Sequence, residues 1–264
     1  MNHNIYKNYK STTKKIYWRF RSLVEKFFTG ELLLREGDTD MALSTVYPYL
    51  SKEPVIVEAG AFDGGDTIKI ATKWPYSRIY AFEPVDENFD RLVKTTADYP
   101  NIRRYKLALS ESNGKAIFYH SFSKTKPDRP AAGSLLVPRE HLEYAPHVEF
   151  NRTSEVETIT LDSWAKREKI DSIDFLWLDM QGMEFRVLKN APNVLKSVRV
   201  IYTEVEFVEA YEGQQQYAEI RSFLENMEFV VLAKSFTKGE ISNPKRTRKW
   251  FGNVVFVKKS LLIG

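Results

Sequence analysis

The segment VIVEAGAFDGGDTIKIA, residues 55–71, constrains the fold more than any other part of the chain. An apolar run ends at Glu58-Ala59-Gly60, a turn follows through Asp63-Gly64-Gly65, and a helix-like pattern begins after it. In open α/β sheets, a strand that ends in such a turn usually lies beside the ligand. The N-terminus of the following helix then points its free N–H groups into that space. We therefore expect a ligand at this turn.

The remainder of the chain alternates between strand-like and helix-like segments. Helical spacing of apolar residues, as at residues 217–227, separates several of the strand-like segments. Such alternation predicts an α/β fold with a doubly wound, mostly parallel, Rossmann-like sheet of seven strands. The last two strands follow one another without an obvious helix, so we expect the final strand to be antiparallel. The seven predicted strands lie at residues 55–60, 78–84, 103–110, 173–182, 198–207, 229–236 and 252–259, with an extra strand at 114–121.

Composition limits the classes of protein that this chain can represent. Its 264 residues, 43% of them hydrophobic, suffice for one large domain with appendages. There is no cysteine, which excludes disulfides and thiolate metal sites. No stretch approaches the roughly 20 apolar residues of a membrane span, and the N-terminus lacks the apolar core of a secretory signal. We therefore expect a cytoplasmic protein.

Basic residues gather at the N-terminus. Residues 1–30 contain seven Lys or Arg and one acidic residue, and KRTRK at 245–249 is a second basic run. Apolar residues at helical spacing predict a helix over residues 12–28. These features fit either a solvated surface or peripheral contact with an anionic surface, such as the inner face of a membrane. We divide the chain into a basic helical extension, residues 1–50, and one domain, residues 51–264.

Residues 122–155 interrupt the alternation. They contain four prolines, two histidines and charges of both signs. We expect an ordered excursion of the domain, acting as a lid or setting substrate specificity, rather than a separate domain.

Glu83 narrows the kind of ligand. It ends the second predicted strand, 23 residues after Gly60, at the spacing where a carboxylate binds the two ribose hydroxyls of an adenosine. The turn lacks the G-x-G-x-x-G spacing of a dinucleotide site, and Glu58 and Asp63 would repel a pyrophosphate. The same two carboxylates suit a ligand with an ammonium group. S-adenosylmethionine has such a group and no phosphate, so we expect it as the cofactor.

Further motifs follow in a fixed order along the chain: EAGAFDGGD at 58–66, FEP at 82–84, ALSE at 108–111, TLD at 160–162 and WLDMQGME at 177–184. Together, over roughly residues 54–235, they resemble the FkbM-type S-adenosylmethionine-dependent methyltransferases. The resemblance implies a seven-stranded methyltransferase fold and, most often, O-methylation of a sugar hydroxyl or a similar group. Two positions depart from the family pattern, because Trp177 stands where the family has lysine and Gln181 where it has glutamate.

The glycine turn, the end of the second strand and the resemblance together predict a cofactor site. We expect S-adenosylmethionine to contact Glu58, Gly60, Ala61, Phe62, Asp63, Gly64, Thr67, Glu83, Pro84, Ala108, Ser110 and Asp179.

Acidic residues at strand ends are candidates for the chemistry. Methyl transfer to a hydroxyl requires alignment of its oxygen and removal of its proton near the transition state. Asp179 ends the fourth predicted strand, and Glu204 and Glu206 end the fifth and face the same way. We expect Asp179 or His141 to assist deprotonation, with Glu206 as a further catalytic candidate. Asp179 with Glu204 or Glu206 can also hold Mg²⁺, but we do not expect the reaction to require a metal.

The leading hypothesis is O-methylation of a hydroxyl on a sugar, glycan or glycolipid, with no nucleic-acid partner. Gln181 and Trp177 leave open a non-catalytic protein that uses the same fold to bind a glycan or a protein. The broken glycine spacing and the two acids argue against an NAD-dependent oxidoreductase. The N-P-P-Y or D-P-P-Y motif of amino-methylating enzymes is absent, which argues against nucleic-acid methylation.

Overall fold

The computed structural model describes residues 26, 30–125, 132–238 and 249–262. Of the helix predicted at residues 12–28, only Lys26 lies within these ranges, and of the basic run at residues 245–249 only Lys249. Both predictions therefore fall almost wholly outside the described residues. Within the described ranges, no helix has the length and apolarity needed to cross a membrane.

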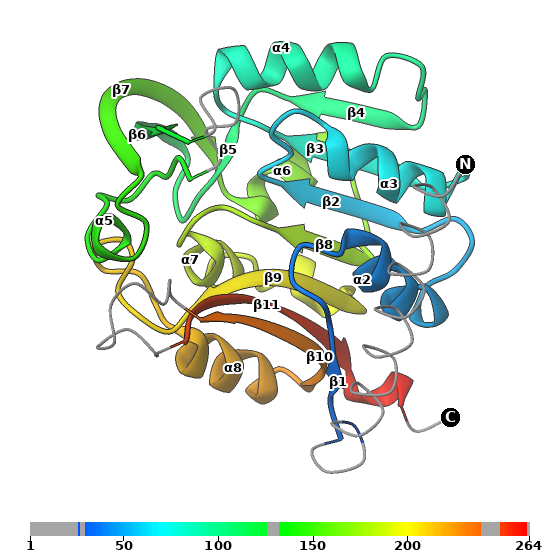
Figure 1. Cartoon of the computed structure of the whole chain (residues 1–264). Helices are drawn as coiled ribbons and strands as arrows, with labels where there is room; N and C mark the ends of the chain where they lie inside the picture. The colour runs from blue at the N-terminus through cyan, green and yellow to red at the C-terminus, as the bar shows by residue number, and fades with distance from the viewer. Residues whose placement is uncertain (1–25, 27–29, 126–131, 239–248, 263–264) are drawn as a thin grey trace, which may run out of the picture.

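An eight-stranded sheet forms the centre of the molecule (Figure 1), in the order β1-β10-β11-β9-β8-β2-β3-β4. The neighbours from β9 to β4 run parallel, whereas β11 is antiparallel to both β9 and β10. The predicted parallel sheet with an antiparallel final strand is thus confirmed, and a two-residue strand, β1, extends its edge. The strands are β1 (Leu32–Leu33), β2 (Val55–Ala59), β3 (Arg78–Phe82), β4 (Ile102–Tyr105), β8 (Phe175–Leu178), β9 (Val200–Glu206), β10 (Phe229–Lys238) and β11 (Lys249–Lys258).

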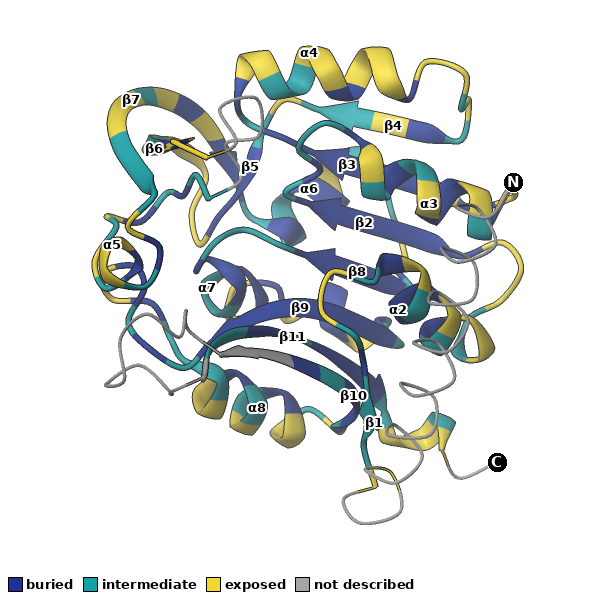
Figure 2. Cartoon of the chain, in the orientation of Figure 1, coloured by how far each residue is buried: buried dark blue, intermediate teal, exposed yellow. Residues whose placement is uncertain are grey.

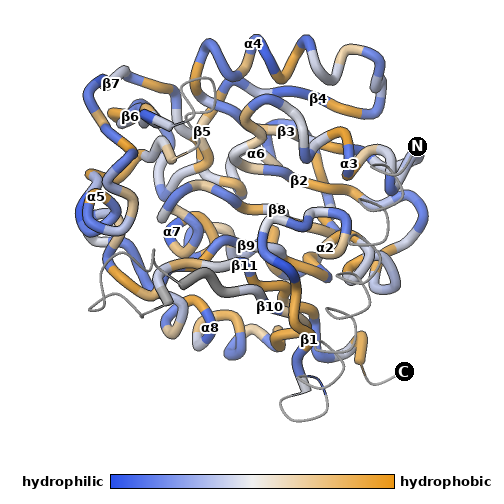
Figure 3. Tube along the Cα trace, in the orientation of Figure 1, coloured by the Kyte–Doolittle hydropathy of each residue, from blue (hydrophilic) through white to orange (hydrophobic). Residues whose placement is uncertain are grey.

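Helices cover both faces of this sheet, because neighbouring residues of a buried strand point to opposite sides. In β2, Val55 and Val57 pack with α6, α7 and α8, whereas Ile56 packs with α2, α3 and α4. The strands are accordingly buried and hydrophobic while the outer helix surfaces are exposed (Figures 2 and 3). The helices are α2 (Thr39–Val46), α3 (Gly65–Lys73), α4 (Asp86–Thr95), α6 (Leu161–Glu168), α7 (Glu184–Lys189) and α8 (Tyr217–Asn226), with short 3₁₀ helices at Tyr47–Tyr49, Val194–Lys196 and Lys259–Leu261.

A second sheet, which we call the arm, stands beside the end of the central sheet toward which the arrowheads of β2 and β3 point (Figure 1). It consists of β5 (Ala108–Leu109), β6 (Gly114–Ser123) and β7 (Val148–Ile159), in the order β5-β7-β6. β6 and β7 form a long antiparallel pair. The arm therefore faces the carboxyl ends of the parallel strands, where α/β folds bind ligands.

The arm changes two predicted boundaries. The strand predicted at residues 103–110 is divided, because β4 joins the central sheet and β5 joins the arm. The segment predicted as an excursion, residues 122–155, begins inside β6, carries the short helix α5 (His141–Tyr144) and ends inside β7. Residues 151–153 of β7 are all exposed, so the apolar alternation that marks a strand is visible only from Val156 onward.

Candidate functional site

A cavity of about 840 Å³ lies between the carboxyl ends of the central strands and the arm. It is large enough for a cofactor-sized ligand with a second molecule beside it. Its walls come from the glycine turn, the ends of β3 and β8, the start of α4, and the arm. The predicted residues that line it are Glu58, Gly60, Ala61, Phe62, Asp63, Glu83, Pro84, Ala108 and Asp179.

The glycine turn brings the end of β2 against the end of β8. Gly60 has φ +84° and donates from its N–H to the carbonyl of Phe82, at 3.1 Å. A Cβ at this position would lie 1.8 Å from the carbonyl oxygen of Asp179. Gly64, with φ +83°, then starts α3 as its N-cap residue. Only glycine fits the first position, and the turn leaves backbone facing the cavity.

Glu83 ties the end of β3 to this turn. Its carboxylate accepts hydrogen bonds from the N–H groups of Phe62 and Val85, each at 3.0 Å, and from Asn88 Nδ2 at 3.4 Å. Burial nevertheless raises the pKa of Glu83 to about 7. The buried carboxylate lines the cavity, so two hydroxyl donors of a ribose would find a fixed acceptor here.

Glu58 adds a buried carboxyl group with an unpartnered oxygen to the same wall. It is only 1% exposed, and its Oε2 has no hydrogen-bond partner among the described residues. Burial raises the pKa of Glu58 to about 8. An uncompensated carboxyl beside a cavity favours a cationic ligand group, since a positive charge would stabilise its ionised form. The residues present therefore fit an adenosine that carries an ammonium group.

A hydrogen-bonded network follows β8. Gln181 Nε2 donates to Asp179 Oδ1 at 2.9 Å and to Glu204 Oε2 at 2.6 Å. Gln181 Oε1 accepts from the hydroxyl of Tyr211 at 2.9 Å, which fixes the orientation of the amide. Burial raises the pKa of both Asp179 and Glu204. Asp179 lines the cavity, so this network holds an ionisable carboxyl at its wall.

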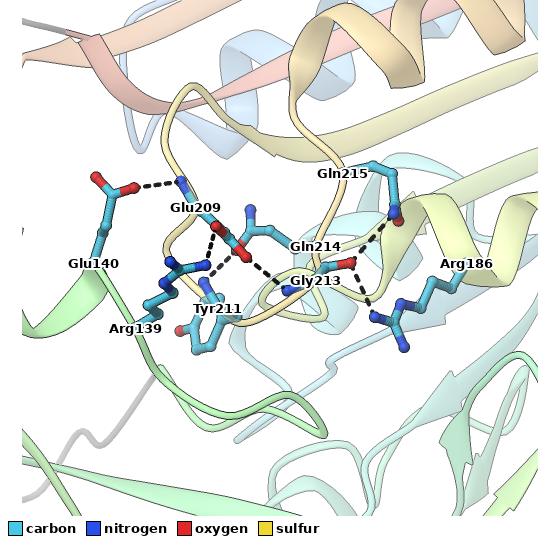
Figure 4. Close-up of polar contacts among 8 residues, drawn as sticks. All are labelled: Arg139, Glu140, Arg186, Glu209, Tyr211, Gly213, Gln214 and Gln215. Atoms are coloured by element: carbon cyan, nitrogen blue, oxygen red, sulfur yellow. Dashed lines mark hydrogen bonds and ion pairs between the residues drawn. The ribbon is translucent and has the colours of Figure 1, made fainter.

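The loop that carries Tyr211 is fixed by its own polar contacts (Figure 4). Glu209 forms an ion pair with Arg139 and accepts from the N–H of Gly213 at 2.9 Å. The carbonyl of Gly213 accepts from Arg186 Nη2, also at 2.9 Å. These contacts anchor residues 207–216, and with them the phenol that orients Gln181.

Residues 58–231, more than half of the chain, match the methyltransferase FkbM domain family. The chain belongs to this family. The 2-O-methyltransferase NoeI of Sinorhizobium fredii is 30% identical over 190 residues, which are 72% of this chain and 78% of NoeI. The hexuronic acid methyltransferase AglP of Haloferax volcanii is 25% identical over 190 residues, 71% of this chain and 65% of AglP. The chain is thus an S-adenosylmethionine-dependent methyltransferase, and the non-catalytic alternative is set aside.

Among solved structures, the precorrin-6y C5,15-methyltransferase of Geobacter metallireducens aligns with a TM-score of 0.46 and 11% identity, over 83% of this chain and 87% of that chain. At this distance the similarity adds nothing about the reaction.

The two departures from the FkbM pattern have structural consequences. Trp177, where the family has lysine, stacks on Tyr202 with ring centroids 3.7 Å apart and planes at 15°. Gln181, where the family has glutamate, places a neutral amide between two carboxyls. Glu184 stabilises the backbone turn between β8 and α7 by accepting hydrogen bonds from the N–H groups of Met180 and Gly182. The stacked ring of Trp177 and the neutral amide of Gln181 thus occupy two positions where the family has charged side chains.

Several predicted residues lie outside the cavity walls. His141 is buried against Phe150, Tyr211 and Trp250, with ring centroids 5.3 to 5.5 Å away, and burial lowers its pKa to about 4. Glu206 is 3% exposed, and its pKa is raised by burial. The others are Gly64, Thr67 and Ser110.

The arm supplies cavity residues that the sequence analysis missed, among them Asn151 and Arg152 of β7. His120 of β6, Arg152 and Glu87 of α4 lie together at this wall. The antiparallel register places His120 opposite Arg152. If a strand had been predicted from residue 148 onward, rather than from Val156, its antiparallel pairing with the strand predicted at residues 114–121 could have placed His120 opposite Arg152.

The part of the chain that the structure describes contains no group of three or more His, Asp or Glu residues arranged to hold a metal ion. The amide nitrogen of Gln181 lies between Asp179 and Glu204, two of the three candidate magnesium ligands.

Proposed function

We propose that this enzyme transfers the methyl group of S-adenosylmethionine to a hydroxyl group of a sugar. NoeI and AglP, by their names a 2-O-methyltransferase and a hexuronic acid methyltransferase, support this acceptor class. The observation that carries the proposal is the position of Asp179. Its carboxyl lines a cavity that continues from the glycine turn to the arm, so it can face both the cofactor and an acceptor.

The residues of the cavity divide the work of the reaction. S-adenosylmethionine supplies a methyl carbon activated by its sulfonium. Glu83 would accept hydrogen bonds from the ribose hydroxyls, and ionised Glu58 would pair with the ammonium group. Asp179 would take the proton of the acceptor hydroxyl as its oxygen received the methyl group, and the sulfur would leave with the electron pair of the carbon–sulfur bond. Among the three predicted catalytic residues, Asp179 is the one that lines the cavity.

Calorimetric titration with S-adenosylmethionine, S-adenosylhomocysteine and NAD tests the cofactor site. We expect one-site binding of both adenosyl compounds, no binding of NAD, and loss of binding in Glu83→Ala. The exposed Glu53→Ala is the matched control and should bind as the wild type does. Absence of binding by either adenosyl compound would overturn the proposed function.

Methyl transfer to sugars tests the reaction. With labelled S-adenosylmethionine, label should appear as an O-methyl group on a sugar, and Asp179→Asn should lose turnover while retaining cofactor binding. Full turnover in both Asp179→Asn and His141→Ala would show that neither residue is the base. Retained O-methylation after treatment with EDTA and dialysis would show that no metal is required.

We also infer from the sequence that the basic residues of segment 1–30 promote contact with an anionic membrane surface, where a glycolipid acceptor would lie. Sedimentation with vesicles containing phosphatidylserine, compared with neutral vesicles, tests this. Equal binding to both would contradict it.

A further inference from the structure

The arm forms one wall of the cavity with a chemistry unlike that of the cofactor turn. The turn contributes backbone and carboxyl groups, including Glu58 and Asp63. The arm contributes aromatic, amide, imidazole and guanidinium groups and no carboxylate. The cavity-lining residues of β6 and β7 are Phe118, His120, Ser121, Phe122, Asn151 and Arg152.

Phe118 and Phe122 give this wall two aromatic rings. Phe122 is 40% exposed although it lines a cavity. The ring of Phe118 packs over Gly133, where an added Cβ would come within 2.6 Å of a ring carbon. Glycine at this position therefore allows the ring to lie where it does. Aromatic faces of this kind pack against the apolar C–H face of a sugar ring.

Arg152 supplies the positive charge of the wall. Its Nη1 and Nη2 both donate to a single oxygen of Glu87, Oε1, at 3.1 Å. Its Nη2 also lies 3.2 Å from His120 Nδ1, which must accept, so His120 Nε2 carries the proton and donates to Ser154 Oγ at 2.7 Å. His120 thereby orients the guanidinium without competing for an anion. Burial and the neighbouring Arg152 lower the pKa of His120, which favours its neutral form.

The ion pair with Glu87 leaves Arg152 able to bind an anionic ligand group. The two side chains are 57% and 56% exposed, so water competes for both, and such pairs contribute little. Among the described residues, the hydrogen bonds of Arg152 to Glu87 and His120 engage three of its five N–H donors. A guanidinium with free donors at a cavity wall matches the geometry of a carboxylate or a phosphate.

We propose that the arm is the acceptor subsite and that it selects a sugar carrying an anionic group, a carboxylate or a phosphate, which Arg152 binds while Phe118 and Phe122 pack on the sugar ring. This inference rests on the proposed function, since it assigns an acceptor to the same cavity. Arg152 is the specificity-determining residue, and Glu87 competes with the acceptor for it.

The test is binding of the protein, saturated with S-adenosylhomocysteine, to immobilised matched glycans. The pairs are glucuronic acid with glucose, galacturonic acid with galactose, and mannose 6-phosphate with mannose. We expect the acidic member of at least one pair to bind more tightly than its neutral partner. The uronic acid pairs and the phosphate pair distinguish the two sources of the anion.

Variants at the ion pair should change this preference in opposite directions. Arg152→Gln should weaken binding of the acidic glycan by roughly tenfold or more, because a charged hydrogen bond is lost. Glu87→Gln should strengthen it, because the competing carboxylate is removed. Arg78→Gln, an exposed site at the amino end of β3, is the control and should bind as the wild type does.

Each contrary result has a distinct meaning. Preference for neutral sugars, or an acidic preference that Arg152→Gln leaves unchanged, overturns the inference while a sugar methyltransferase stands. Binding to none of the glycans, with S-adenosylhomocysteine still bound, overturns both the subsite and the sugar acceptor. Titration of each variant with S-adenosylhomocysteine establishes that its fold is intact.

Discussion

Gly60 directly follows β2 and lies against the backbone carbonyl of Asp179, which directly follows the neighbouring strand β8. Alanine at this position would combine a strained φ of +84° with a Cβ only 1.8 Å from the carbonyl oxygen of Asp179. We expect Gly60→Ala to destabilise the protein by more than about 4 kcal/mol, because backbone on both sides must move. It should also abolish cofactor binding. Urea unfolding measures the first effect and calorimetric titration the second.

Gly37→Ala is the matched control for this substitution. Gly37 also has a positive φ, +65°, but an added Cβ would meet no atom within 4 Å. We expect Gly37→Ala to lower the free energy of unfolding by about 1–2 kcal/mol, because only the strain of the left-handed backbone conformation is added. Similar losses in the two variants would show that the approach of Asp179 does not determine the choice of glycine at position 60.

Gln181 controls the charge around Asp179. Gln181→Glu would add a carboxyl where an amide now donates to both Asp179 and Glu204, so the pKa of Asp179 should rise further. If Asp179 is the base, the acidic limb of the pH profile of kcat/KM moves to higher pH, and activity lost at pH 7 returns as pH rises. Gln216→Glu, the same change at the N-cap of α8, should leave the profile unchanged. An unmoved profile in Gln181→Glu would contradict Asp179 as the base.

The sequence predicted the cofactor turn better than the parts of the site around Gln181 and Arg152. The reason is physical. Glu58, Gly60 and Glu83 were recognisable because the turn and the strand end that hold them are local in the chain. The contact between Gln181 and Tyr211 joins residues 30 positions apart, and that between Arg152 and Glu87 joins residues 65 apart. Such contacts depend on tertiary packing, which no local pattern encodes. For the same reason His141 was predicted near the chemistry, whereas its ring packs in an aromatic cluster.

At the scale of elements, the loop between β9 and α8 determines where Tyr211 lies (Figure 4). Glu209 is central to this loop, because it pairs with Arg139 and accepts from the N–H of Gly213. We expect Glu209→Ala to speed hydrogen exchange at Gly213 and its neighbours without lowering the urea midpoint appreciably. Glu212→Ala, an exposed change on the same loop, should leave exchange as it is. Unchanged protection at Gly213 in Glu209→Ala would show that backbone contacts alone fix the loop.

The central sheet and the arm also differ in how far sequence reveals them. The central strands are buried on both faces, so continuous apolar runs such as residues 55–57 mark them. In β7, by contrast, none of residues 148–155 is buried, so this part of the strand has no apolar pattern that distinguishes it from a loop. The arm was therefore identified only in part, although it forms the cavity wall opposite the cofactor turn.

At the scale of the whole molecule, buried carboxyl groups make stability depend on pH. Burial raises the pKa of Glu58 to about 8 and those of Glu83 and Glu184 to about 7, from an ordinary value of 4.5. Between these values the native state binds more protons than the unfolded state, so the free energy of unfolding falls as pH rises. The contribution of these carboxyl groups to the free energy of unfolding is largest below about pH 4.5 and is lost by about pH 8.

We therefore expect the cofactor-free protein to be less stable at pH 8 than at pH 5.5, by several kcal/mol, since each pKa unit corresponds to about 1.4 kcal/mol. Urea midpoints across this range measure the slope. Glu58→Gln removes one of the titrating groups, so its slope should be shallower, whereas the exposed Glu53→Gln should retain the wild-type slope. S-adenosylhomocysteine should bind more tightly as pH rises, because its ribose hydroxyls and ammonium group favour ionised Glu83 and Glu58. Stability that increased between pH 5.5 and 8 would mean that these carboxyl groups are already ionised in the empty cavity.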